Sequence, residues 1–342
     1  GATDMLTYLK SLGVRFKDEI IEIYGAHWRR CHKPAMPNGE GYINTLHAAA
    51  LRLEAKFLTQ AAATRLIKES GRVVGVEFRH GSALKKAYAR CAVVCASGGF
   101  GANAKMVEQY FPALSELSHD NTPGSTGEVL LMAQEAGAQL IDMDCIMAIP
   151  FWGGRLTDYV GADIYLDSTG RRFVNEGSSW GEISAAIRRQ PNGQCWVVTD
   201  SQSLQGASRS SKIMNGVVKV ADSIEEMAAG MKVDPTTLKT TLERYNSFAR
   251  KGVDEDFGKN MFTQEIKRPP YFYGKEKLYV HYCCGGLKID EKARVINTQG
   301  HPIEGLFAAG ETTGGIHGKD RVGGCSLTDC FVFGREAGKT SA

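Results

Sequence analysis

The chain has 342 residues, of which 43% are hydrophobic and 23% are charged, and it contains 39 glycines. This length and composition are typical of a globular protein of two domains, and they exclude a disordered or fibrous chain. The 41 basic and 38 acidic residues are well mixed along the sequence, which argues against a nucleic-acid partner because no stretch concentrates one sign of charge.

The cysteines and the apolar runs argue against a metal or haem protein and against a membrane-spanning chain. The nine cysteines form no paired CxxC sets and no CxxCH haem motif, so we expect reduced, mostly buried thiols and no metal site. No run reaches the roughly 18 apolar residues that a membrane span requires, so we expect no span in this chain. The sequence leaves the compartment open between a cytoplasmic and a periplasmic location of bacterial type.

Four elements are predicted in the first third of the chain. Apolar spacing predicts an amphipathic helix over 5–16 that ends at Gly13, and a second helix over 42–59. Residues 72–78 alternate as a strand does and follow a Ser-Gly turn. Residues 92–96 are wholly apolar, which favours a short strand buried on both faces of a sheet, and they lead into a glycine turn.

The remaining elements continue this mixed pattern. Helices are expected over 129–138 and 235–250, and strand-like alternation surrounds a glycine within 159–174. Residues 287–290 and 294–296 are expected to form a hairpin, 305–311 another buried strand that runs into glycines, and 326–338 a final helix. The first and last thirds both combine helices with short apolar strands that run into glycine turns. The pattern therefore predicts an α/β fold with a domain inserted in the middle.

Two apolar strands end in glycine turns, one at Gly98-Gly99 and one at Gly310-Glu311. In open α/β sheets, ligands bind outside the carboxyl ends of the strands, and glycines there let a cofactor approach the backbone. Glu311 is placed to accept a hydrogen bond from a ribose or ribityl hydroxyl. Taken singly, each turn is equally compatible with an ordinary end of a strand.

The start of the final helix has the features of a site for a charged cofactor. Gly323 and Gly324 allow close approach of a ligand, and the free N–H groups at Ser326 and Leu327 make this helix end partially positive. Such an end would stabilise the negative charge that a reduced isoalloxazine ring acquires.

The same region carries a resemblance to a known family. Residues 306–324, LFAAGETTGGIHGKDRVGG, closely resemble the terminal flavin motif of the fumarate reductase and flavocytochrome c family. The similarity continues through 326–327 and 332–335, and extends upstream to SGGFGAN at 97–103, Thr126-Gly127, GRRFVNE at 170–176 and the glycine pair 285–286. Several blocks in this order are far more specific than one glycine pattern.

The resemblance implies a fold and a cofactor. We expect a Rossmann-like flavin domain over 1–143 and 283–342, interrupted by an α+β capping domain over 144–282 that covers the substrate. Members of the family bind FAD and begin with a GxGxxG turn that this sequence lacks, so the flavin domain is expected to be incomplete. Either the chain is a fragment or a partner supplies that half, and alone it should bind FAD weakly or not at all.

Some of the family's functional residues are kept and others are replaced. Arg321 matches the family's carboxylate clamp, His281 the first histidine of its histidine pair, and Thr157-Asp158 its threonine-glutamate step for moving protons. Tyr282 replaces the second histidine of the pair. Ile149 replaces the substrate histidine and Trp180 the arginine that donates the proton, while a further arginine falls in a gap.

These replacements indicate a pocket for a larger and flatter substrate than fumarate. Large apolar side chains stand where cations are expected, and such side chains stack on flat molecules. Simple packing in the cap would account for the same residues. The expected pocket residues are Ile149, Phe151, Trp152, Thr157, Trp180, Glu182 and His317.

The leading hypothesis is an FAD-dependent reductase of an activated C=C bond in an unsaturated carboxylate or enone, acting in anaerobic respiration. Flavin N5 delivers hydride, Arg321 holds the substrate oxygen, and Tyr282 is the candidate acid with Asp158 as runner-up. Two alternatives remain open: a dehydrogenase that desaturates a ketone or acid, and a catalytically inactive binding module. The sequence identifies neither the electron donor, whether a protein or a nicotinamide or flavin reductase, nor the small-molecule substrate.

Overall fold

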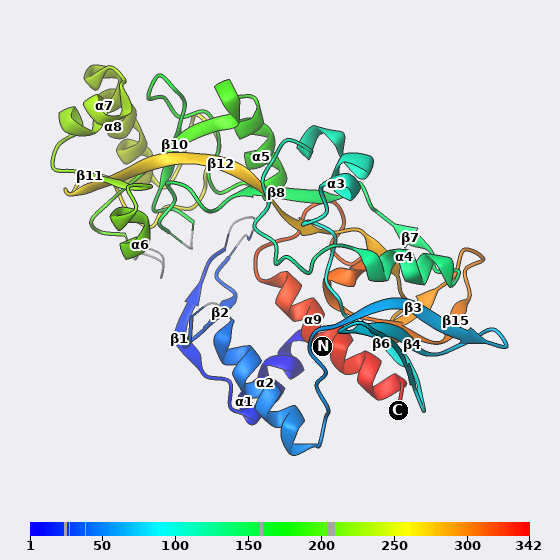
Figure 1. Cartoon of the computed structure of the whole chain (residues 1–342). Coiled ribbons are helices and arrows are strands. Elements are labelled where there is room, and N and C mark those ends of the chain that lie inside the picture. The colour runs from blue at the N-terminus through cyan, green and yellow to red at the C-terminus, as the bar shows by residue number, and fades with distance from the viewer. Residues whose placement is uncertain (24–25, 27, 38, 158–159, 204–208) are drawn as a thin grey trace. The chain divides into compact units, whose positions relative to one another are not determined.

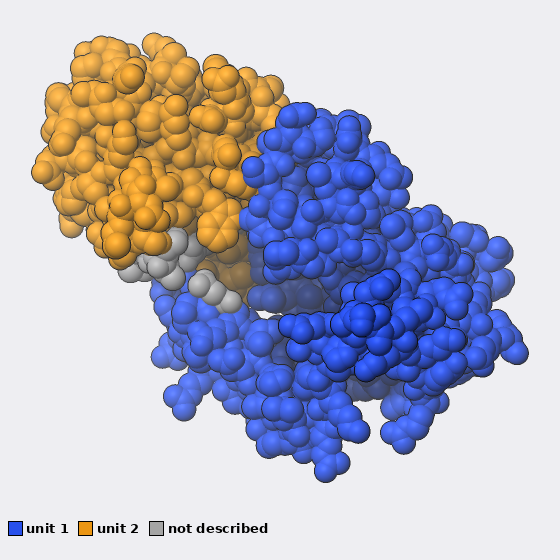
Figure 2. Space-filling model, in the orientation of Figure 1, with its two compact units in different colours: residues 1–19, 32–147, 280–342 blue, residues 20–31, 148–279 orange. Residues whose placement is uncertain are grey.

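A computed structural model of the chain describes residues 1–23, 26, 28–37, 39–157, 160–203 and 209–342 (Figure 1). Two compact units divide these residues (Figure 2). Unit 1 comprises residues 1–19, 32–147 and 280–342, and unit 2 comprises residues 20–31 and 148–279. Each unit is therefore assembled from segments far apart in the sequence. None of the helices in the described residues is both long and apolar enough to cross a bilayer.

The first and last parts of the chain supply the elements of unit 1. They are α1 (Ala2–Leu12), α2 (Glu40–Arg52), β3 (Ala61–Glu69), β4 (Arg72–His80), β5 (Ala83–Tyr88), β6 (Val93–Cys95), α3 (Ala104–Tyr110), α4 (Glu128–Glu135), β7 (Leu140–Ile141), β13 (Gly286–Lys288), β14 (Arg294–Ile296), β15 (Pro302–Ala308), β16 (Thr313–Gly314) and α9 (Cys325–Thr340), with short 3₁₀ turns at Pro112–Leu114 (η1) and Gly310–Thr312 (η3). They form a β3-β4-β5 sheet, a β14-β15-β6 sheet and a β16-β13-β7 sheet.

Unit 2 is built around one larger sheet. Its elements are β9 (Ile164–Leu166), α5 (Trp180–Arg188), η2 (Pro191–Gly193), β10 (Gln194–Asp200), α6 (Arg209–Met214), β11 (Lys219–Ala221), α7 (Ile224–Met231) and α8 (Pro235–Lys251). Strands β8 (Ile146–Pro150) and β12 (Tyr271–Cys283) carry the chain into unit 2 and out of it again. Strands β1 (Phe16–Ile21) and β2 (Cys31–Pro34), which pair with each other, do the same for residues 20–31. The sheet order is β11-β12-β10-β9, with β8 also paired to β12.

Two helix ends lie where the sequence predicts them, the end of α1 at Gly13 and the start of α8 at Pro235. Gly13 closes α1 with φ 108°, a conformation that glycine adopts without strain. Asp234 caps α8, accepting a hydrogen bond from the Thr237 N–H, and Pro235 occupies the first turn, where no backbone donor is required. Leu238, Leu242 and other apolar residues of its inner face pack on β9 and β12. Local signals were therefore sufficient for these elements.

Three local predictions were wrong. The second helix ends at Arg52 rather than Thr59, because the chain reverses at Glu54 with φ 60°. Strand β6 is not buried on both faces: it lies at the edge of its sheet, and the Val94 side chain is 41% exposed. The segments 287–290 and 294–296 belong to different sheets and share a single bridge, Ile289 with Val295.

Candidate active site

The two glycine turns lie side by side in unit 1. Strand β15 pairs with β6 in parallel, with Leu306 opposite Val93 and Ala308 opposite Cys95. Because parallel strands present their carboxyl ends at one edge of a sheet, the turns that follow them are brought together. The Thr312 hydroxyl donates to the Gly98 carbonyl over 2.8 Å. The two turns are separate in the sequence, and the strand pairing joins them into one surface, called the glycine platform below.

Glu311 is held firmly in this platform. Its Oε1 accepts a hydrogen bond from the Cys283 N–H over 2.9 Å. Gly99 packs against it so closely that a Cβ at that position would lie 2.7 Å from Oε1, so a larger residue there would displace the Glu311 carboxylate. Burial raises the pKa of the Glu311 carboxyl above its ordinary value, although the Cys283 N–H and His281 partly offset this. A bond from Glu311 to a ribityl or ribose hydroxyl stays a prediction.

Helix α9 begins next to the second glycine turn. Gly310 has φ 74°, and a Cβ there would lie 2.9 Å from the Cys330 Sγ of this helix. The helix has 16 residues and starts after Gly324, which has φ 77° and carries no side-chain cap. Leu327 is 43% exposed, so the positive end of the helix is accessible to a ligand.

Arg321 and Tyr282 form a stacked pair in the same unit. The guanidinium carbon of Arg321 lies 4.5 Å from the centre of the Tyr282 ring, and both residues are buried. The His317 ring meets the Tyr282 ring edge-on, with the ring centres 5.8 Å apart. In the described part of the chain, the Arg321 Nε is buried without a hydrogen-bond partner. The structure therefore brings together three of the predicted site residues.

Tyr282 is a weak acid in this setting. Burial raises the pKa of its phenol far above the ordinary value, the carboxylates Glu311 and Asp329 raise it further, and Arg321 partly opposes them. The hydroxyl is therefore protonated throughout the physiological range, as a proton donor must be. After donation the phenolate would need prompt reprotonation.

His281 is fixed by a carboxylate that the sequence did not single out. Its Nδ1 lies 2.8 Å and 3.0 Å from the two carboxylate oxygens of Asp120. The Asp120 side chain is 5% exposed and that of His281 28%. A carboxylate that holds one ring nitrogen sets which nitrogen faces the surroundings. Asp120 lies in a loop without a recognisable motif, so only its position in space gives it this role.

Unit 2 contains a buried arginine that sequence reasoning did not single out. The guanidinium carbon of Arg155 lies 5.1 Å from the centre of the Trp180 ring and 5.8 Å from that of Phe151. Arg155 is 4% exposed. An arginine from a different place in the sequence thus stacks on the tryptophan that replaces the family's arginine.

The loop that carries Arg155 is pinned by buried charged groups. Lys212 Nζ donates to the carbonyls of Phe151 and Arg155, over 3.0 Å and 2.6 Å. Glu276, 1% exposed, accepts from the backbone N–H groups of Gly153 and Arg155. These contacts fix the backbone of residues 151–155 and hence the aromatic side chains it carries.

The predicted proton-transfer pair is only partly visible. The Thr157 hydroxyl donates to Asp163 Oδ2 over 2.9 Å, and both residues are buried. Asp158, the runner-up acid, lies outside the described residues. Burial raises the pKa of the Asp163 carboxyl, although Arg155 and Lys259 lower it in part. Asp163 is thus the carboxyl group that Thr157 contacts, and sequence reasoning missed it.

The other predicted pocket residues differ in exposure. Ile149 and Trp180 are buried, whereas Phe151 and Trp152 are 38% and 50% exposed. Glu182 lies in the first turn of α5, where its carboxylate and N–H both bond the Ser179 hydroxyl. This capping arrangement accounts for Glu182 without a substrate.

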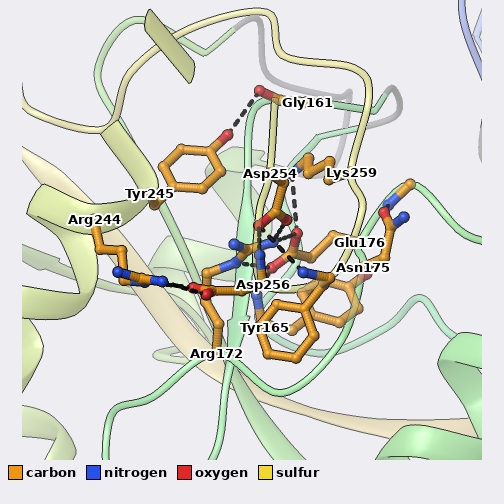
Figure 3. Close-up of polar contacts among 12 residues, drawn as sticks. Gly161, Tyr165, Arg172, Asn175, Glu176, Arg244, Tyr245, Asp254, Asp256 and Lys259 are labelled. Carbon is orange, nitrogen blue, oxygen red and sulfur yellow. Dashed lines mark hydrogen bonds and ion pairs between the residues drawn. The ribbon is translucent and has the colours of Figure 1, made fainter. Parts of the chain in front are cut away.

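The RFVNE segment forms a buried ion network in unit 2 (Figure 3). Arg172 donates from Nε and Nη2 to the two oxygens of Glu176, and from Nη2 to Asp254, each over 2.8 Å. Lys259 Nζ donates to Glu176 Oε2 over 3.1 Å. Burial alone would raise the pKa of Glu176, but Lys259 and Arg172 outweigh it, so the pKa lies below its ordinary value. The charged residues of the motif therefore pair with one another and with Asp254 and Lys259 inside this unit.

Comparison with known proteins identifies the family of the chain. The model of a family described as the FAD binding domain matches residues 2–327. The chain belongs to this FAD binding domain family. The fold, the flavoprotein class and the cofactor predicted from the sequence are thereby confirmed.

The chain is similar in sequence to two named reductases and in structure to a third. The chain is 33% identical to the NADH:acrylate oxidoreductase of Vibrio harveyi over 99% of this chain and 36% of that protein. It is 35% identical to the urocanate reductase of Eggerthella lenta over 90% of this chain and 54% of that protein. An open flavocytochrome c3 fumarate reductase structure matches 99% of this chain and 62% of that chain, with TM-score 0.73 and 30% identity. The chain thus spans between about a third and two thirds of these proteins.

The residues of unit 1 fit the isoalloxazine part of the FAD of this FAD binding domain family. The accessible first turn of α9 offers backbone N–H groups and follows Gly323 and Gly324, and Gly310 packs against Cys330 of the same helix. The buried, unbonded Arg321 Nε leaves a donor available beside it. Gly98, Gly99, Gly310, Gly323, Gly324, Ser326 and Leu327 are the residues expected to hold the cofactor.

Proposed function

We propose that the protein containing this chain is an FAD-dependent oxidoreductase that reduces an activated carbon–carbon double bond. The stack of Arg321 on Tyr282, in the unit whose α9 terminus is accessible, carries the proposal. A fixed guanidinium stabilises the negative charge that an unsaturated acid or ketone develops when its β carbon accepts a hydride. Relatives named for acrylate and urocanate support the reaction class, because both compounds are unsaturated acids.

The site residues of unit 1 each have a part in this proposal. Bound FAD, in its reduced form, supplies the hydride. Arg321 holds the substrate oxygen, and the protonated Tyr282 hydroxyl gives its proton to the α carbon. His281, held by Asp120, is a second candidate for binding the substrate. Glu311 and the glycine turns keep the cofactor in position.

We further propose that the acceptor is bulky or aromatic and carries one acidic or carbonyl group. The exposed rings of Phe151 and Trp152 favour stacking on a flat molecule. Ile149 and Trp180 stand where the family pattern has a histidine and an arginine, so a small dicarboxylate would lose counter-ions. Arg155 is 4% exposed and stacks on the Trp180 ring, so it does not replace the counter-ions that are lost.

The test is anaerobic reoxidation of the reduced flavin in the full-length protein. Fumarate, acrylate, urocanate, an aryl acrylate and a cyclic enone are mixed in turn with the reduced protein, and the flavin absorbance is followed. We expect the aryl acrylate or the enone to reoxidise the flavin fastest. Rapid reoxidation by fumarate alone would contradict the substrate assignment, and no reoxidation by any of them would contradict the reductase.

A further inference from the structure

Unit 1 contains a second histidine–carboxylate pair, next to Tyr282. His317 Nε2 lies 3.3 Å from Asp329 Oδ2. The two side chains are 10% and 2% exposed, so the carboxylate is buried and the imidazole keeps a small exposed surface. Asp329 lies in the second turn of α9, and His317 lies in the loop before this helix. The fold therefore brings His317 and Asp329, twelve positions apart in the sequence, into contact.

The carboxylate of Asp329 is placed to orient the imidazole. Only Oδ2 contacts His317, and Oδ1 is buried without a hydrogen-bond partner in the described residues. A buried carboxylate favours a neighbour that donates a proton to it. With the Nε2–H directed at Asp329, Nδ1 is the ring nitrogen left to exchange a proton with other groups.

The surroundings of the pair identify the group that it would serve. The His317 ring meets the edge of the Tyr282 ring, whose face carries the guanidinium of Arg321. Glu311, Asp329 and the Cys330 thiol also influence the pKa of Tyr282, and the Glu311 carboxylate already accepts a hydrogen bond from the Cys283 N–H. Arginine stays protonated at all relevant pH values, and burial raises the pKa of the Cys330 thiol. An imidazole is the side chain suited to exchanging protons near neutral pH.

We propose that His317, positioned by Asp329, returns a proton to Tyr282 after each reduction. This proposal rests on the proposed function. The substrate double bond accepts a hydride, with its two electrons, from the reduced flavin, and its α carbon takes the proton of the Tyr282 hydroxyl. His317 Nδ1 takes a proton from solvent and passes it to the phenolate, and the imidazole returns to its neutral Nε2–H form. The double bond is reduced, the flavin is oxidised, and each protein group returns to its starting state.

The first experiment reads the state of the imidazole rather than activity. The full-length, FAD-loaded protein is labelled with ¹⁵N-histidine, and the His317 signals are assigned as those lost in His317→Gln. We expect the Nε2–H tautomer in the wild type, and its loss in Asp329→Asn, whose amide can donate to the ring. The same tautomer in both proteins would overturn the positioning role of Asp329.

The second experiment measures reoxidation of the reduced flavin by the best acceptor over many turnovers. His317→Gln should lower the steady rate by about 10²- to 10⁴-fold, the usual contribution of a proton-transfer group. Imidazole added to His317→Gly should restore part of the rate, which a purely structural role would not allow. His301→Gln, at an exposed position outside the site, is the matched control and should not change the rate.

The outcomes separate this inference from the proposed function. If the wild type is not reoxidised by any unsaturated acceptor, the reductase assignment fails. If the wild type turns over and His317→Gln turns over equally fast, only the role of His317 is overturned. Loss of the rate without rescue by imidazole would also overturn it and leave His317 a packing residue.

Discussion

The guanidinium carbon of Arg155 lies 5.1 Å from the centre of the Trp180 ring, and both side chains are buried. A buried cation–π contact contributes up to about 2 kcal/mol. We therefore expect Arg155→Met to lower the free energy of unfolding by about that amount and to change the fluorescence of Trp180, measured as the difference from Trp180→Phe. Arg155→Lys should recover part of both effects. Arg209→Met, which removes a cation over Phe272 instead, should leave the tryptophan emission unchanged.

Tyr282→Phe tests the candidate acid. The substitution keeps the ring on which Arg321 stacks and removes only the hydroxyl, so bound flavin should be retained. We expect turnover with the best acceptor to fall by about 10²- to 10⁴-fold. Flavin content from the visible spectrum and steady-state rates provide the measurement. Unchanged turnover would exclude Tyr282 as the proton donor.

Gly99→Ala tests the glycine platform. The new Cβ would lie 2.7 Å from Glu311 Oε1 and 3.0 Å from Cys283 Cβ, so Glu311 would have to move. We expect the purified full-length variant to hold less FAD than the wild type. Gly124→Ala is the matched control, since nothing lies within 4 Å of a Cβ there. Equal flavin content in both variants would show that the platform tolerates the shift.

The ion network of unit 2 predicts a loss of stability when one charge is removed. Lys259→Met leaves Glu176 with one cation fewer, and both side chains are fully buried. Breaking a buried pair costs about 3–5 kcal/mol, to be measured by urea denaturation. Lys251→Met, in an exposed pair with Glu255, should cost less than about 1 kcal/mol.

The same network predicts a pH dependence of stability. The pKa of Glu176 is lower in the folded protein than its ordinary value, so the folded state gains stability above the ordinary pKa of about 4.3. That stability is lost as the pH falls through the lower, folded pKa. Glu176→Gln should therefore be less stable at neutral pH and should lose less further stability on acidification. An identical pH profile in both proteins would contradict the assignment.

The sequence by itself determined the family, the cofactor and most elements. Caps such as Asp234 and Gly13 act over a few residues, so their effect can be read locally. The glycine turns and Arg321 belong to a long motif that specifies close backbone approach. The parallel pairing of β6 with β15, which joins the two turns, connects residues more than 200 positions apart and gives no local signal.

Only the tertiary structure decided which side chains act together. Asp120, Asp329, Asp163 and Arg155 carry no motif, and each acquires its role because the fold places it beside His281, His317, Thr157 or Trp180. The free energy of such contacts depends on distance and burial, which are properties of the packed chain. A replacement such as Trp180 can be recognised along the sequence, whereas the arginine that stacks on it can be found only in space.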